Sequence, residues 1–373
     1  MTTQDIGGSY RELAAGLDAA YHRVMENGHY ILGKEVTAFE SEWAEYCGAC
    51  HGVGTASGLD ALTLILRALN IGPGDEVIVP ANTFIATWLA VVLVGAKPVP
   101  VDPDPVTYLV EADAIRASIG PNTAVLLPVH LYGLPVDVHA MRELAKQYGL
   151  ALVYDAAQAH GARFAGQPIG CFGDACAWSF YPTKNLGAFG DAGAVTTSDH
   201  ALAERIRRFR NYGSGTKKHH FEEPGCNSRL DELQAAFLRA KLPRLDAWNE
   251  RRCRHSSRYT DSLRDSTAIL PVEPAPRKSV WHQYVIQLKK RDAALAVLER
   301  AGYPAAVHYP IPPHLQPACR SLGFKPGQFP VAENLAGSIL SLPCHPYMPD
   351  LVPAIVLKHL GPLLRLYSSR VER

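Results

Sequence analysis

Short apolar runs alternate with amphipathic stretches through the first two thirds of this 373-residue chain. The runs with strand character fall at residues 51–55, 76–80, 97–101, 124–128, 150–155, 175–180 and 193–197. Segments with helical periodicity lie between most of them, at residues 59–69, 85–94 and 138–148. Near-continuous apolar strands separated by helices predict an α/β fold, with a largely parallel sheet that helices cover on both faces. In such sheets, ligands bind beyond the carboxyl ends of the strands.

The sequence pattern changes after about residue 245. Proline becomes denser, with 13 residues in positions 1–270 and 15 in the shorter stretch 271–373. The elements expected there are a long charged helix, a strand and a second helix, at residues 245–263, 284–288 and 292–301. We therefore expect a large domain over residues 1–245, with an N-terminal helical segment, and a small C-terminal α+β domain over residues 246–373.

Composition excludes several classes of protein. The chain has 37 basic and 36 acidic residues, so neither nucleic acid nor a membrane surface is an expected partner. The longest apolar stretch, residues 84–96, has 13 residues, whereas a membrane-spanning helix needs about 20. The N-terminus shows no basic segment followed by an apolar one, and eight cysteines are too few for a disulfide scaffold. A cytoplasmic protein is expected.

The first candidate site lies where a predicted strand gives way to small residues and then to a helix. The free N–H groups and the dipole at that helix start favour a bound phosphate. Ser57 and Asp60 also fit a capping box, so a simple capped helix is an equal alternative at this point. The spacing of Gly52, Gly54 and Gly58 misses the dinucleotide fingerprint by one residue, which disfavours an NAD site.

Two further candidates also follow predicted strands. Asp155 ends the run at 150–155, and a carboxylate buried there needs a cationic partner, such as a protonated ring nitrogen. Lys184 lies in a glycine-rich loop beyond the run at 175–180, where partial desolvation lowers the pKa of an amine and makes it nucleophilic. Taken singly, an aspartate that caps a turn and a surface lysine stay open as alternatives.

The cysteine and histidine patterns carry less weight. Cys47, Cys50 and His51 match the spacing of haem c attachment, but that chemistry needs export, and His51 opens a predicted core strand. The other cysteines show no second paired spacing, so no metal site is expected. The run from Lys217 to His220 lies in a predicted loop, where it is a minor candidate for contact with a phosphate.

Six segments together resemble the DegT/DnrJ/EryC1/StrS family of pyridoxal 5'-phosphate (PLP)-dependent sugar aminotransferases. They are SGLDAL at 57–62, PANTFIAT at 80–87, PVHLYG at 128–133, DAAQAHG at 155–161, SFYPTKNL at 179–186 and GCNSRLDELQ at 225–234. The resemblance runs from about residue 33 to the C-terminal region. It implies the fold-type I architecture of aspartate aminotransferase, with a mostly parallel seven-stranded sheet, and a homodimer with active sites at the subunit interface.

The resemblance also assigns residues to the cofactor. Lys184 is similar to the lysine that holds PLP as a Schiff base, and Asp155 to the aspartate that pairs with the pyridinium nitrogen. The other matching positions are Gln158 and Phe84 on the two ring faces, Gly58, Leu59 and Ser179 in the phosphate cup, and Asn227 from the neighbouring subunit. The family usually has threonine at the position of Leu59, so here only the backbone N–H is available.

Two details resemble the branch that aminates carbon 3 of dTDP-3-keto-6-deoxyhexoses. They are Leu59 in place of threonine and the segment VHYPIPPHLQP at 307–317. By this resemblance, Tyr181, His308 and Tyr309 are contacts of the hexose, although a proline-rich connector with stacked aromatic rings is an equal alternative for the C-terminal segment. L-glutamate is the amino donor that the family implies.

Two other functions are weighed against this expectation. One is aminotransfer to carbon 4 of another nucleotide-linked keto sugar. The more distant one is a non-catalytic or regulatory relative, which would be expected to lose the lysine or the aspartate. Relatives that act as sugar dehydratases have histidine at the lysine position, so Lys184 favours amino transfer.

Overall fold

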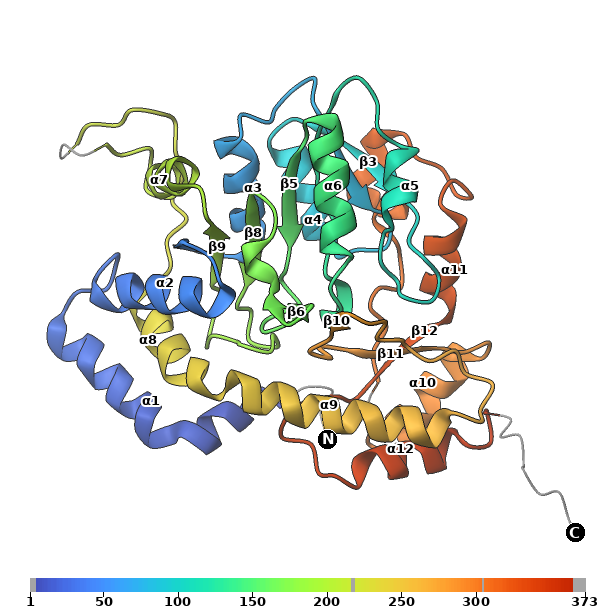
Figure 1. The fold of residues 1–373 in the computed structure, drawn as a ribbon. Coiled ribbons are helices and arrows are strands. Elements are labelled where there is room, and N and C mark those ends of the chain that lie inside the picture. The colour runs from blue at the N-terminus through green and yellow to red at the C-terminus, as the bar shows by residue number, and fades with distance from the viewer. Residues whose placement is uncertain (1–4, 216–218, 304, 365–373) are drawn as a thin grey trace, which may run out of the picture.

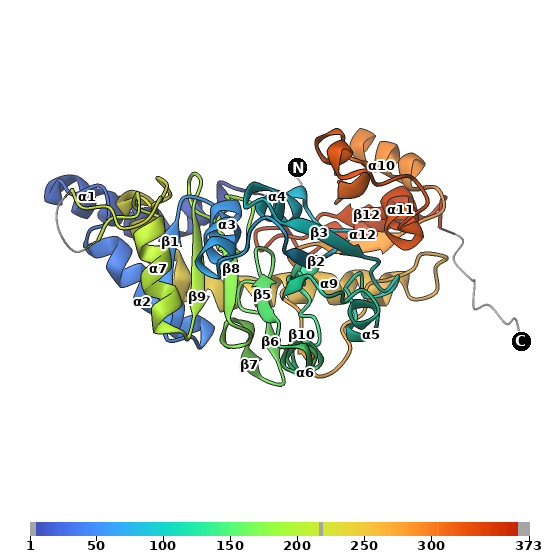
Figure 2. The same cartoon turned by 90° about the horizontal axis from the view of Figure 1, so that it is seen from above.

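The computed structural model describes residues 5–215, 219–303 and 305–364. Its central sheet has seven strands in the order β1-β9-β8-β5-β4-β2-β3, which Figures 1 and 2 show from two sides. The strands are β1 (His51–Thr55), β2 (Glu76–Pro80), β3 (Lys97–Val101), β4 (Thr123–Leu126), β5 (Ala151–Asp155), β8 (Ala175–Ser179) and β9 (Gly193–Thr197). Only β9 runs against the others. The expected mostly parallel seven-stranded sheet is confirmed.

Helices cover both faces of this sheet. The helices are α2 (Lys34–Cys47) and α6 (Val138–Tyr148) on one face, and α3 (Gly58–Ala68), α4 (Ile85–Leu93) and α7 (His200–Phe209) on the other. Successive strand residues point to opposite cores: Tyr154 and Trp178 pack with α2 and α6, whereas Val153 and Ala177 pack with α3 and α4. Because both faces are buried, the strands read as continuous apolar runs.

A second apolar core lies at the C-terminal end of α9 (Leu245–Leu263), the long helix along the lower edge of Figure 1. There, an antiparallel pair of strands packs with two helices. These are β11 (Tyr284–Gln287), β12 (Ile339–Leu342), α10 (Arg291–Arg300) and α12 (Val352–Leu360). Leu245 of α9 belongs to the sheet core and Tyr259 to the second core. Since α9 contributes to both, the domain boundary between residues 245 and 246 stays a prediction.

The remaining elements surround these two cores. They are α1 (Gly8–Asn27), α5 (Ala112–Arg116), α8 (Glu232–Lys241), α11 (Pro330–Ser338), β6 (Arg163–Phe164), β7 (Gln167–Pro168), β10 (Arg277–Lys278) and the 3₁₀ turns Leu131–Gly133, Ile169–Cys171, Leu242–Arg244, Pro313–Leu315 and Pro317–Leu322. Helix α1 packs on α8 through Ala20, Val24 and Ala236. In the described part of the chain, no helix combines the length and apolarity that crossing a membrane requires.

The topology brings the candidate residues to one edge of the sheet. Because all strands except β9 run the same way, their carboxyl ends meet at that edge. Ser57 follows β1, Phe84 follows β2, Asp155 ends β5 and Ser179 ends β8. Segments more than 100 residues apart in the sequence thus supply one site.

Candidate active site

A cavity of about 550 Å³ lies beyond this edge. Its volume falls in the range of sites for small molecules and cofactors, about 300–1,000 Å³. The predicted site residues that line it are Gly58, Leu59, Phe84, Asp155, Gln158, Ser179, Tyr181, Lys184, His308 and Tyr309. Of the predicted set, only Asn227 is not part of this lining. The structure therefore brings together residues that the sequence places in five separate segments.

Asp155 is buried at the end of β5 with both carboxylate oxygens bonded. Thr87 Oγ1 donates to Oδ2 at 2.8 Å, and the Ala157 N–H donates to Oδ1 at 3.1 Å. Thr83 Oγ1 lies 2.8 Å from Thr87 Oγ1, and it must be the donor there because Thr87 has only one hydroxyl proton. Burial raises the pKa of Asp155, while these two bonds and the charge of Lys184 oppose that rise. The carboxylate is held in one orientation and favours a cationic partner in the cavity.

Lys184 is half-buried in the loop that follows β8. The backbone N–H of Lys184 donates to the Tyr181 carbonyl at 2.8 Å, and the Phe180 N–H donates to the Ala192 carbonyl at 2.8 Å. These two bonds connect parts of the same loop. Burial lowers the pKa of the Lys184 amine to about 8, against the opposing effect of Asp155. An amine with this pKa is partly neutral near pH 7 and is nucleophilic in that form.

Three histidines near Lys184 have lowered pKa values and carry no positive charge. Burial is the main reason that the pKa of His160 is lowered to about 3 and that of His308 to about 4, and the charge of Lys184 lowers both further. His282 is buried as well, its pKa is also lowered, and its Nδ1 lies 3.0 Å from Asn185 Oδ1. All three rings are therefore neutral at physiological pH.

The start of α3 is both a capped helix and a wall of the cavity. Ser57 Oγ accepts the Asp60 N–H at 3.1 Å, so the capping interpretation is confirmed at this residue. The Asp60 carboxylate accepts the Ser228 hydroxyl at 2.8 Å. A Cβ atom at Gly58 would lie 2.7 Å from Ser179 Cβ, so glycine lets the start of α3 approach the end of β8. This junction suits an anion, because helix N–H groups and a serine hydroxyl border the same space.

Gln158 connects the sheet to the C-terminal part of the site. Its Oε1 accepts the Tyr132 N–H at 2.7 Å, and its Nε2 donates to the Tyr309 hydroxyl at 3.0 Å. The Tyr132 hydroxyl donates in turn to the His308 carbonyl. Sequence reasoning gave Tyr132 no role, although it lies inside the segment PVHLYG. Sequence reasoning also gave Thr87 no role. The signal that could have indicated one is its position four residues after Thr83, which lets the two hydroxyls meet.

The aromatic side of the cavity is more open. Phe84 and Tyr181 are each 51% exposed. The ring centre of Phe84 lies 5.3 Å from that of Tyr309, and His308 Nδ1 lies 2.8 Å from Ser341 Oγ. These four residues, Phe84, Tyr181, His308 and Tyr309, form what we call the outer wall of the cavity.

Other candidates lie away from the cavity. Asn227 is exposed and forms an isolated bridge with Asn211. Lys217 and Lys218 of the predicted phosphate-contacting loop lie outside the described residues, and His219 and His220 are exposed and do not line the cavity. Among the residues that the structure describes, no group of three or more His, Cys, Asp and Glu side chains has an arrangement suited to a metal ion.

Comparisons with known proteins agree with this geometry. The model of the DegT/DnrJ/EryC1/StrS aminotransferase family matches residues 13–357. The chain is 52% identical over 345 residues to the erythromycin biosynthesis sensory transduction protein EryC1 of Saccharopolyspora erythraea, covering 92% of this chain and 94% of that protein. It is 49% identical over 345 residues to the dTDP-3-amino-3,4,6-trideoxy-alpha-D-glucose transaminase of Streptomyces venezuelae, covering 92% and 91%.

A solved structure supports the fold over nearly the whole chain. The crystal structure of S. venezuelae DesV in complex with a ketimine intermediate superposes with a TM-score of 0.94 at 46% identity. The match covers 99% of this chain and 98% of that one. The expected α/β architecture is thus confirmed independently of the strand assignments. From the family match and these identities, the chain belongs to the DegT/DnrJ/EryC1/StrS aminotransferase family.

Proposed function

We propose that this protein uses PLP to transfer an amino group from L-glutamate to the C3 ketone of a dTDP-3-keto-6-deoxyhexose, giving a dTDP-3-amino-3,6-dideoxyhexose. The main support is that one cavity presents the low-pKa amine of Lys184 and the buried carboxylate of Asp155. Family membership and the 49% identity to a 3-amino sugar transaminase support the substrate class. Glutamate rests on the family resemblance.

The residues present fit PLP. Asp155 supplies a fixed carboxylate for the ring nitrogen, and the close contact between Gly58 and Ser179 leaves helix N–H groups and a hydroxyl for the phosphate. Phe84 and Gln158 border the same cavity and would lie on the two ring faces. When bound, PLP supplies a protonated aromatic ring that stabilises negative charge on the carbon bonded to the transferred nitrogen.

Lys184 has two tasks in this proposal. Its neutral Nζ would bind the cofactor covalently in place of the aldehyde oxygen, which leaves as water, and would hold it until the amino donor displaces the lysine. The freed Nζ would then take the proton from the α-carbon of the donor and deliver it to the cofactor carbon bonded to the transferred nitrogen. Asp155 keeps the ring nitrogen protonated throughout, because removing its positive partner would leave a buried charge unpaired.

Three residues of the outer wall, Tyr181, His308 and Tyr309, would bind the sugar. Tyr181 is half-exposed at the mouth of the cavity, and His308 presents a neutral ring. The Tyr309 hydroxyl is oriented by Gln158 Nε2 at 3.0 Å. Neutral donors and acceptors of this kind suit hydroxyl and keto groups, which carry no charge.

A substrate panel tests the reaction. The purified protein with PLP and L-glutamate is incubated with a dTDP-3-keto-6-deoxyhexose, a dTDP-4-keto-6-deoxyhexose and a UDP-linked 3-keto sugar, and products are identified by mass and NMR. We expect an amine at carbon 3 of the first compound. Amination only at carbon 4 would support the alternative aminotransferase, and no amination of any compound would contradict the proposal.

The regulatory alternative has less support from the site. One relative is named a sensory transduction protein, but a non-catalytic protein has no need for a low-pKa amine next to a buried carboxylate. Both groups are present here and line the same cavity. The substrate panel distinguishes the two functions, because a purely regulatory protein would produce no amino sugar.

We also propose a cytoplasmic homodimer with shared sites. The exposed position of Asn227, outside its own subunit's cavity, suits a residue that reaches the phosphate of a neighbouring subunit. Mixing the Lys184→Ala and Asn227→Ala proteins, after dissociation and reassembly, should restore activity that neither variant has, because mixed dimers contain one intact site. Absence of recovery in mixed dimers shown to form would contradict shared sites.

A further inference from the structure

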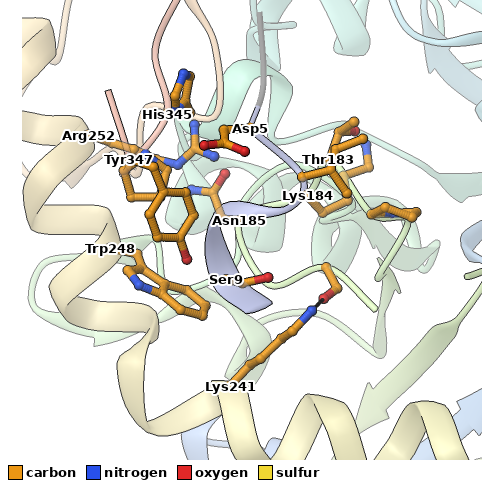
Figure 3. Close-up of a pocket in the computed structure, with 14 residues that line it drawn as sticks. Asp5, Ser9, Thr183, Lys184, Asn185, Lys241, Trp248, Arg252, His345 and Tyr347 are labelled. Carbon is orange, nitrogen blue, oxygen red and sulfur yellow. Dashed lines mark hydrogen bonds between the residues drawn. The ribbon is translucent and has the colours of Figure 1, made fainter. Parts of the chain in front are cut away.

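Another lysine, Lys241, is buried, and it lies below Lys184 in the view of Figure 3. It is the last residue of α8 and is 2% exposed. Its Nζ donates to the Gly187 carbonyl at 2.7 Å, the bond drawn as a dashed line in Figure 3, and lies 3.4 Å from the ring centre of Phe189. A small second cavity, of about 40 Å³, has both Lys184 and Lys241 in its lining.

Packing alone does not explain a lysine at this position. Among the ion pairs of the described residues, none includes Lys241, and burial lowers its pKa to about 7. Desolvating an ammonium group is costly, and an apolar side chain of similar volume would avoid that cost. The hydrogen bond of the Lys241 side chain is to the backbone carbonyl of Gly187. This contact indicates that the lysine serves to hold the loop.

The loop is tight where Lys241 holds it. A Cβ atom at Gly187 would lie 2.5 Å from the Pro182 carbonyl oxygen, so the two arms of the loop touch. Gln234, also on α8, accepts the Phe189 N–H with its Oε1 at 2.8 Å. Helix α8 therefore holds the arm after Lys184 at two peptide groups, one through Lys241 and one through Gln234.

The residue next to Lys184 is held from a different direction. Asn185 Nδ2 donates to Asn249 Oδ1 at 2.8 Å and to the Val280 carbonyl at 3.0 Å. These partners belong to α9 and to the segment before β11, and they do not depend on Lys241. The loop thus has two sets of supports, and α8 supplies the set beyond Gly187.

We propose that Lys241 is a positioning residue for Lys184, which it serves by fixing the Gly187 peptide so that the Lys184 amine is held in the main cavity opposite Asp155. Lys241 acts through the backbone of the loop. A displacement of about 1 Å at a reacting group can lower a rate by two orders of magnitude, so a support of this kind has kinetic consequences. The inference rests on the proposed function, because it assigns the reacting amine to Lys184.

The test compares Lys241→Met, which removes the donor, with Lys241→Gln, which keeps one. Lys97→Met is the matched control, because the Lys97 side chain is 68% exposed and pairs only with Glu76 among the described residues. Three readouts are measured: the rate at which cofactor-free protein captures added PLP, amide exchange of residues 180–192, and kcat and KM with the sugar substrate.

We expect the Met variant to capture PLP about tenfold more slowly, with kcat lowered similarly and the sugar KM unchanged. Its amides at residues 187–190 should exchange faster, the Gln variant should recover much of the capture rate, and the control should match the wild type. A folded Met variant with wild-type capture and kcat would overturn the inference. If the Met variant does not fold, a Gln variant with faster exchange but wild-type capture overturns it.

The same data separate this inference from the proposed function. A wild-type protein that captures PLP but aminates no sugar refutes the proposed substrate and leaves the role of Lys241 supported by the capture rates. A wild-type protein that captures no PLP refutes both. Equal capture in the wild type and a folded Met variant refutes only the role of Lys241.

Discussion

The two sides of the main cavity are built differently. The sheet wall, which we define as Gly58, Asp155, Ser179 and Lys184, comes from strand ends and the turns directly after them. The outer wall combines Phe84 and Tyr181, two half-exposed residues after β2 and β8, with His308 and Tyr309 of the C-terminal segment. The sheet wall, placed by strand ends, suits the chemistry common to a family, whereas Tyr181, His308 and Tyr309 of the outer wall suit the choice of substrate.

A small hydrogen-bond network orients the C-terminal part of the outer wall. Gln158 bonds to both the Tyr132 N–H and the Tyr309 hydroxyl, and Tyr132 bonds to the His308 carbonyl. Changes in the sheet wall should affect kcat, and changes at Tyr181, His308 or Tyr309, or at Tyr132 behind them, should affect KM for the sugar. The predictions below test that separation.

The largest effect is expected for Lys184→Ala. Turnover should fall by about 10⁴-fold or more, because the change removes both the nucleophile and the proton carrier. The variant should fold normally, as checked by its thermal unfolding midpoint, since the substitution keeps the backbone bond from the residue 184 N–H to the Tyr181 carbonyl. Retained turnover of the folded variant would place the chemistry on another residue.

Asp155→Asn should lower kcat by about 10³-fold, because an amide does not hold the ring nitrogen protonated. Thr87→Val is the graded companion: it removes one bond to the carboxylate and should cost about tenfold. Both variants should keep the wild-type KM for the sugar within error. An unimpaired Asp155→Asn enzyme would mean that the ring nitrogen has a different partner.

Capture of PLP by the cofactor-free protein should depend on pH through Lys184. Its folded-state pKa is about 8, and only the neutral amine attacks, so the rate should rise about tenfold per pH unit below 8 and level off above. Stopped-flow absorbance measures this directly. A rate that is flat from pH 6 to 9, or that levels off only above pH 10, would contradict a desolvated amine at this position.

Tyr132→Phe should have the smallest effect and the one most specific to the outer wall. It removes the bond to the His308 carbonyl but keeps the backbone bond to Gln158. We expect KM for the sugar to rise by about fivefold, the value of one neutral hydrogen bond, with kcat and PLP absorbance unchanged. A fall in kcat with constant KM would show that the two walls are not separable.

The sheet wall was predictable from the sequence because its signals are local. Runs of apolar residues located all seven strands, and since Asp155 ends one strand and Lys184 lies in the loop after another, the topology brings them to one edge. The resemblance to a family supplied the roles. The capping of α3 by Ser57 could also be predicted, since it depends on residues three apart.

The remaining features depend on contacts between distant residues. Tyr132 meets a residue 176 positions later, and Lys241 meets one 54 positions earlier, with no local pattern to indicate either. The reversed direction of β9 was equally hidden, because a buried antiparallel strand has the same apolar composition as a parallel one. Composition also did not fix the domain boundary near residue 245, because α9 contributes side chains to both cores.

Lys184 and Lys241 together allow a direct test of the central claim. Lys184 and Lys241 both have a lowered pKa, about 8 and about 7, but only Lys184 lines the main cavity. Borohydride reduction of the PLP-loaded protein, followed by peptide mass mapping, identifies the lysine that carries the cofactor. We predict one modified residue, Lys184. Modification of Lys241, or of no lysine, would contradict the account.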